Sequence, residues 1–165
     1  MIHRSGVRSV FVALAAVLLA AGGCRYGFSG GGLPRSVRTV AILPFDNQTP
    51  TADLPRDITQ TLRDEMQRRL GLREDSEARA DAIVRGTILR YEPDIPIGFS
   101  ADPNQANTAR RSLQISVDIS IIETATGRTL LERRGLAANG EYAESGELNG
   151  RRQAIDKLVA QIIQG

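Results

Sequence analysis

The residue with the most distinctive chemistry in this chain is its single cysteine, Cys24. It directly follows Ala21-Gly22-Gly23, which ends an apolar run over residues 10–21 that two arginines precede. A positive start, an apolar centre and a small-residue end are typical of a secretory signal peptide. A thiol placed directly after small residues can also be the nucleophile that accepts a diacylglyceryl group. We therefore expect residues 1–23 to be a lipoprotein signal peptide and Cys24 to be the lipidation site.

Two other interpretations of this segment remain. The apolar run is much shorter than the roughly 20 residues that a membrane-spanning helix needs, so a transmembrane anchor is disfavoured. An ordinary signal peptide with an unmodified cysteine is the second alternative. The next residue is Arg25 rather than the acidic residue that retains lipoproteins in the inner membrane of enteric bacteria. We therefore expect a lipid-anchored protein of the outer membrane that faces the periplasm.

Four aspartates are candidates for carboxylate-based hydrolysis, namely Asp81, Asp94, Asp102 and Asp118. Such catalysis needs two carboxylates that converge in a cleft with shifted pKa values, and nothing in their spacing brings two together. The only histidine, His3, is lost with the signal, and lipidation leaves no free thiol. We therefore expect no enzymatic activity, no cofactor and no metal site built on histidine or cysteine.

The charge balance limits the partners. Removal of the signal takes away two arginines, so 19 basic and 19 acidic side chains remain. A near-neutral domain has no bulk field to draw it to nucleic acid or to an anionic membrane. We expect no nucleic-acid partner and a membrane contact through the N-terminal lipid.

A glycine-rich segment, residues 24–36, precedes the elements that would carry these residues. We interpret it as a tether between lipid and domain, because glycine loses much entropy on ordering. A phosphate-binding loop is disfavoured because no strand precedes the glycines and no Gly-Lys-Ser/Thr follows them. Hydrophobic periodicity then predicts six elements in one domain over residues 37–165. They are strands over 37–45, 82–91, 113–121 and 129–136, and helices over 54–70 and 148–164.

This order predicts an α+β fold, with two helices packed on one face of a four-stranded mixed, mostly antiparallel sheet. We expect the segment 46–50 to form a turn and the segment from Glu92 to Arg110 to form a long loop. Loops of this length in compact domains are usually functional or disordered. Its apolar residues Ile95, Ile97 and Phe99 either fold back on the core or contact a partner.

In the order of these elements and motifs, the chain resembles the LptE-like family of lipopolysaccharide-assembly lipoproteins. The resemblance covers nearly the whole mature chain and depends on the order and spacing of several motifs rather than on one decisive motif. They are Cys24-Arg25-Tyr26-Gly27-Phe28 with the glycines and Leu33-Pro34 after it, Val37 to Asn47, Ala80 to Ile88, and the turn Thr126-Gly127.

The resemblance implies a lipoprotein that plugs and helps to assemble the large outer-membrane β-barrel that delivers lipopolysaccharide to the cell surface. Some members bind lipopolysaccharide directly. The sequence departs from the family pattern at Leu72-Arg73-Glu74-Asp75-Ser76, where a hydrophobic strand is often found, and this puts one edge strand in doubt. Direct phosphate binding would depend on scattered arginines, and the interpretation we favour is that they are surface charges. They are Arg90, Arg110, Arg111, Arg133 and Arg134.

A rival class shares the first predicted strand. The run from Val40 to Phe45 also looks like the opening strand of peptidoglycan-synthase activators and curli-secretion-type domains. Such proteins bind a synthase or a secretion ring instead of a barrel. The glycine-rich segment after Cys24 and the lone hairpin before the last helix favour the lipopolysaccharide-assembly interpretation.

Overall fold

The computed structural model describes residues 33–98, 110–143 and 146–164, except for the side chains of residues 97 and 98. The elements below all belong to one compact unit, Gly31–Gly165. Among the described residues, no helix combines the length and the apolar character that crossing a bilayer requires.

A mixed sheet forms one layer of this unit, and two helices form the other. In chain order the elements are β1 (Thr39–Ile42), β2 (Asp46–Asn47), α2 (Leu54–Leu70), β3 (Arg73–Glu74), β4 (Ala82–Gly98), β5 (Arg110–Glu123), β6 (Thr129–Ala143) and α3 (Glu147–Gln164). The strand order is β3-β1-β4-β5-β6, and β2 also pairs with β4. The three longest strands, β4, β5 and β6, pair antiparallel, whereas β1, β2 and β3 make short parallel pairings.

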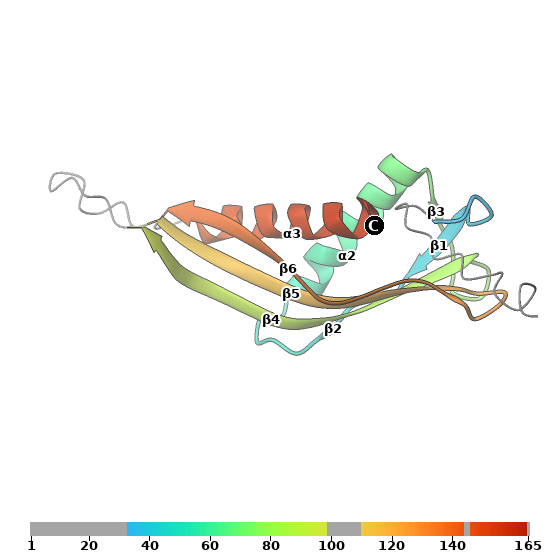
Figure 1. The fold of residues 1–165 in the computed structure, drawn as a ribbon, viewed down its shortest axis with the longest axis horizontal. Helices are drawn as coiled ribbons and strands as arrows, with labels where there is room; N and C mark the ends of the chain where they lie inside the picture. Colours follow the sequence, from blue (N-terminus) through green and yellow to red (C-terminus); the bar gives the residue numbers. More distant parts are fainter. Residues whose placement is uncertain (1–32, 99–109, 144–145, 165) are drawn as a thin grey trace, which may run out of the picture. The chain divides into compact units, whose positions relative to one another are not determined.

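Both helices cover the same face of the sheet, as Figure 1 shows. Helix α3 packs on β5 and β6, and α2 packs against α3. Helix α2 has the bounds that its periodicity predicts, and it ends at Gly71 in the left-handed conformation with φ 66°. The N–H groups of Gly71 and Leu72 donate to the carbonyls of Gln67 and Met66, which closes the last turn as glycine C-caps do.

The core is aliphatic and lies between the sheet and the helices. One face of β5 supplies Leu113, Ile115, Val117, Ile119 and Ile121, all buried, because successive side chains of a strand point to opposite faces. They meet the apolar stripes of the two helices, whose buried members include Ile58, Leu62, Met66, Ala154 and Leu158.

Glycine sets the distance between α3 and the sheet. A Cβ atom built on Gly140 of β6 would lie 1.7 Å from the Gly150 carbonyl oxygen of α3. Any larger residue at position 140 would therefore push the helix away. A second close approach places the ring of Phe45 over Gly86 of β4, 2.2 Å from where a Cβ would stand.

The prediction of two helices on a mixed sheet is confirmed, but the sheet has six strands instead of four. The segment expected as a turn contains β2, whose residues Asp46 and Asn47 pair with Thr87 and Ile88. The edge strand in doubt also forms, as the two-residue β3 beside β1. Two-residue parallel strands carry no periodicity of their own, so the sequence pattern does not reveal them.

The predicted loop from Glu92 to Arg110 was wrong over its first part, because β4 continues to Gly98 opposite β5. Past Ile88 no described strand pairs with the other edge of β4, so Pro93 and Pro96 are tolerated there. Register shifts between Ile88 and Arg90, and between Glu92 and Ile95, mark bulges in this strand.

Strand β6 lies at the edge of the sheet and is also longer than predicted, ending at Ala143. A register shift against β5 interrupts it near Gly135, which has φ 61°. The Gly135 N–H donates to Asp118 Oδ1 at 2.7 Å, and the ammonium group of Lys157 on α3 donates to the Asn139 carbonyl oxygen at 2.9 Å.

Candidate functional site

The structure describes only part of the predicted site residues. Cys24, Phe99 and the side chain of Ile97 lie outside the described residues. Ile95 lies on β4 opposite Ser112 of β5 and is half-buried. The apolar residues that could contact a partner therefore begin on a strand rather than on a free loop.

A polar cluster fixes the backbone of β4 immediately before Ile95. Asp94 is a non-glycine residue with positive φ, 65°, which is uncommon and costs conformational energy. Its backbone N–H donates to the Tyr142 hydroxyl at 3.0 Å, and that hydroxyl donates to Asp94 Oδ1 at 2.7 Å. The guanidinium group of Arg111 also lies 2.8 Å from Asp94 Oδ1. These contacts hold the bulge and so orient the end of β4.

The electrostatics of this cluster follow from its contacts. Hydrogen bonds from Tyr142 and Arg111 stabilise the charged form of Asp94 and lower the pKa of its carboxyl group. Burial, together with the hydrogen bond to Asp94, raises the pKa of the Tyr142 hydroxyl. At neutral pH the aspartate is therefore charged and the tyrosine is neutral, which suits a structural clamp rather than a proton-transfer pair.

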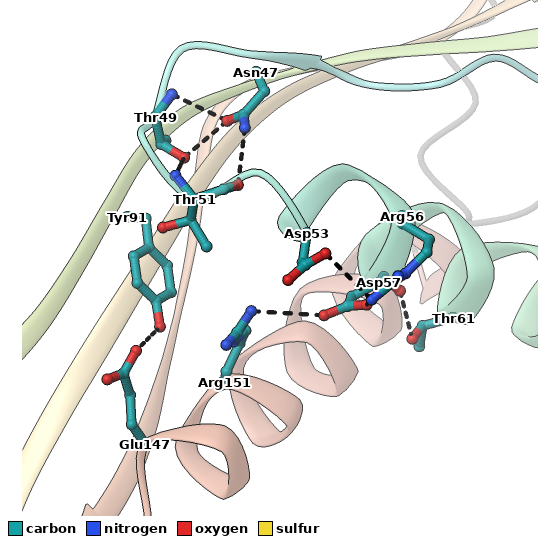
Figure 2. Close-up of polar contacts among 10 residues, drawn as sticks. All are labelled: Asn47, Thr49, Thr51, Asp53, Arg56, Asp57, Thr61, Tyr91, Glu147 and Arg151. Atoms are coloured by element: carbon teal, nitrogen blue, oxygen red, sulfur yellow. Dashed lines mark hydrogen bonds and ion pairs between the residues drawn. The ribbon is translucent and has the colours of Figure 1, made fainter.

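A second polar network joins β4 to both helices, as Figure 2 shows. Tyr91 of β4 donates its hydroxyl hydrogen to Glu147 Oε1 at 2.5 Å, in the first turn of α3. The guanidinium carbon of Arg151, one turn later, lies 5.9 Å from the centre of the Tyr91 ring. The same side chain is 14% exposed, and its guanidinium nitrogen lies 3.7 Å from Asp57 Oδ2 of α2. Burial and the Glu147 carboxylate raise the pKa of Tyr91, so its hydroxyl stays protonated.

The loop before α2 has its own polar support. The side-chain oxygen of Asn47 accepts hydrogen bonds from the backbone and hydroxyl of Thr49, and its amide donates to the Thr51 carbonyl (Figure 2). Such side-chain bonds to nearby backbone are typical of Asn in turns. They shape the loop that leads into α2.

The candidate carboxylates do not converge. Asp81 precedes β4, and its carboxylate accepts the backbone N–H groups of Arg38 and Thr39, both at 2.9 Å. Those hydrogen bonds lower its pKa. Asp118 accepts from Gly135, Asp94 belongs to the cluster described above, and Asp102 lies outside the described residues. Within the described ranges no three potential metal ligands gather.

The five arginines on which direct phosphate binding would depend are dispersed as well. Arg90 faces Glu92 at 3.5 Å and Arg111 is bound to Asp94. Arg133 and Arg134 line a shallow depression of about 270 Å³ on the sheet face away from the helices, where Asp46, Asp118 and Glu132 offset their charge. The structure therefore brings these arginines into no single basic site.

Sequence reasoning missed the contact between Asp94 and Tyr142, which joins residues 48 positions apart. The signal available was an aspartate between Pro93 and Pro96 in a segment that otherwise contains apolar residues. The described residues form a two-layer scaffold with polar clamps and exposed strand edges, an arrangement suited to binding.

Comparison with solved structures supports the fold. The PelC dodecamer from Paraburkholderia phytofirmans is similar with a TM-score of 0.53 and 14% identity, over 82% of this chain and 93% of that chain. CT253 from Chlamydia trachomatis is similar with a TM-score of 0.50 and 10% identity, over 76% of this chain and 92% of that chain. At such identities the likeness concerns the fold alone.

Comparison with sequences gives a more specific result. No curated protein sequence matches the chain. The family model described as "LptE: Lipopolysaccharide-assembly" matches residues 37–164, which include every described strand and helix. The match confirms the resemblance drawn from the sequence motifs. The chain therefore belongs to the LptE lipopolysaccharide-assembly family.

Proposed function

We propose that this protein is anchored in the outer membrane by lipid on Cys24 and faces the periplasm. It binds inside the β-barrel that inserts lipopolysaccharide, helps to assemble that barrel and plugs it. The observation that carries this proposal is the family match over residues 37–164. The family consists of lipoproteins without catalytic activity, and we propose the same for this chain.

The contact with the barrel is proposed at the end of β4, through Ile95, Ile97 and Phe99. Two features of the described residues support it. Past Ile88, no described strand pairs with this edge of β4, so its backbone groups can pair with a strand of another protein. The clamp on Asp94 also fixes the strand direction, which lowers the entropy that ordering costs on binding.

The partner is tested by affinity purification of the mature lipoprotein from detergent-solubilised outer membrane, followed by mass spectrometry. A stoichiometric large β-barrel is the expected result. Recovery of a cell-wall synthase or a secretion ring instead would contradict the barrel proposal and favour the rival class. A self-assembled oligomer without a barrel would contradict it as well.

The contact surface is tested by placing a photo-crosslinking amino acid at Ile95. We expect a crosslink to the barrel from this position. The matched control carries the same group at Asp156, an exposed residue on α3. Equal crosslinking from both positions would show that the end of β4 is not the specific contact.

The anchor is tested separately. Intact-mass measurement of the protein from membranes should show a chain that begins at Cys24 and carries acyl groups. The variant Cys24→Ser should leave no acylated product. An unacylated mature chain in the wild type would contradict the lipid anchor without affecting the barrel proposal.

A further inference from the structure

A groove lies where the described chain begins. It has a volume of about 400 Å³, and it is formed by the turn before β1, the end of α2 and the start of β3. Its lining includes the aliphatic residues Leu33, Leu70 and Leu72 and the arginines Arg35, Arg38 and Arg73. The lining thus combines aliphatic side chains with three arginines and contains no acidic residue.

Local backbone geometry builds the groove. The Val37 N–H donates to the Pro34 carbonyl at 2.9 Å and closes the turn that carries Arg35. The left-handed Gly71 turns the chain between Leu70 and Leu72, and the Arg73 N–H donates to the Arg38 carbonyl at 3.0 Å. The positions of the aliphatic and basic side chains are therefore fixed by the backbone.

The three arginines of the groove, Arg35, Arg38 and Arg73, are exposed, and none makes an ion pair with another described residue. Asp81 lies close enough to Arg38 for the two charges to interact, but backbone N–H groups occupy its carboxylate. The other nearby acids are held by different arginines. Those pairs are Glu65 with Arg68 and Arg69, Glu74 with Arg63, and Asp75 with Arg79.

The groove is also close to the proposed anchor along the chain. Nine residue steps separate Cys24 from Leu33, so an extended tether would span at most about 30 Å. Arg35 and Arg38 follow within the next five positions. The lipid on Cys24 would therefore keep this groove near the bilayer surface.

We propose that this groove docks on the anionic phospholipid surface of the membrane that holds the anchor, a proposal that rests on the lipid anchor proposed above. The guanidinium groups bind lipid phosphates, and the aliphatic lining covers the adjacent apolar part of the interface. The mature chain is neutral overall, so this local cluster, rather than net charge, supplies the attraction.

Vesicle flotation tests the proposal without lipidation and without a barrel. The chain from residue 24 on, with Cys24→Ser, is mixed with phosphatidylcholine vesicles with or without phosphatidylglycerol. We expect binding to the anionic vesicles only, weakened by salt. Each basic residue near such a surface contributes about fivefold in affinity, so Arg35→Gln, Arg38→Gln and Arg73→Gln together should weaken binding about 100-fold.

A matched control keeps the same change in net charge. It carries Arg56→Gln, Arg110→Gln and Arg152→Gln, three exposed arginines outside the groove. The control should bind like the parent chain. An equal loss of vesicle binding in both triple variants would overturn the proposal. Binding that does not depend on vesicle charge, or that requires lipopolysaccharide in the vesicle, would overturn it as well.

A second measurement locates the contact. The chain contains no tryptophan, so a single one introduced at Leu33→Trp reports on the groove alone. Brominated anionic lipid should quench its fluorescence, whereas Leu148→Trp on α3, where the native side chain is 66% exposed, should be unaffected. Quenching at Leu148→Trp with none at Leu33→Trp would overturn the proposal. An unacylated protein in cells would contradict the anchor, and the vesicle measurements would still decide whether the groove binds anionic lipid.

Discussion

Asp94 combines an uncommon backbone conformation with two charge-dependent contacts, and its role is local order. The backbone cost of positive φ at a non-glycine residue has to be offset by the hydrogen bonds from Tyr142 and Arg111. Those bonds favour the ionised carboxylate. The order of the β4 end is therefore tied to the charge of one side chain.

This tie predicts a pH dependence of stability. The pKa of Asp94 is lower in the folded chain than in the unfolded chain, so its stabilisation is present above about pH 4 and is lost as the pH falls through the folded value. The variant Asp94→Asn cannot ionise. Its melting temperature should lie below that of the wild type at neutral pH, and the difference should shrink in acid. A constant difference across pH would contradict this role.

At Gly140 the constraint is steric. The variant Gly140→Ala should destabilise the fold by about 1–3 kcal/mol, because the new Cβ would collide with the Gly150 carbonyl. Chemical denaturation measures this change. The neighbouring exposed residue offers a control, because Asn139→Ala should change the free energy of unfolding by no more than about 0.5 kcal/mol.

At the scale of elements, the contact between Tyr91 and Glu147 joins β4 to the first turn of α3. A double-mutant cycle with Tyr91→Phe and Glu147→Ala should give a coupling energy of about 0.5 kcal/mol or more, since the two side chains share a hydrogen bond. The same cycle with Glu141→Ala, an exposed residue on β6, should give none. Equal values in the two cycles would contradict the contact.

The bounds of α2 could be predicted because its signals agree. Four apolar residues recur at helical spacing, Pro55 lies in the first turn and Gly71 follows the last residue. The ends of β4 and β6 could not be predicted, because their prolines and glycines are poor strand formers. In β4 the prolines stand where one edge lacks a described partner, and in β6 Gly140 makes room for α3. Both reasons depend on neighbours distant in sequence.

The candidate site was less predictable than the fold. The prediction for Cys24 comes from a local pattern, since a signal-peptide pattern is read along the chain and needs no tertiary context. The groove beside Leu33 needs three separated segments to meet, and the sequence shows its arginines only as scattered charges. Tertiary contacts, rather than composition, decide which of them form an ion pair within the described residues.

At the scale of the whole molecule, one core joins both helices to the sheet. Leu62 is fully buried in that core, so Leu62→Ala should cost about 2–5 kcal/mol. Unfolding followed by circular dichroism and by tyrosine fluorescence should still show one shared transition. The control Leu148→Ala, at an exposed position, should change stability by no more than about 0.5 kcal/mol.

The outer edge of β6 has a consequence for the protein before it meets any partner. An exposed edge strand is a template on which another chain can pair and aggregate. Here the bulge at Gly135 interrupts the template, and the ammonium group of Lys157 takes the Asn139 carbonyl that an incoming strand would need. Within the described residues, the outer edge of β6 is therefore less open to pairing with a second copy of the chain while the protein folds.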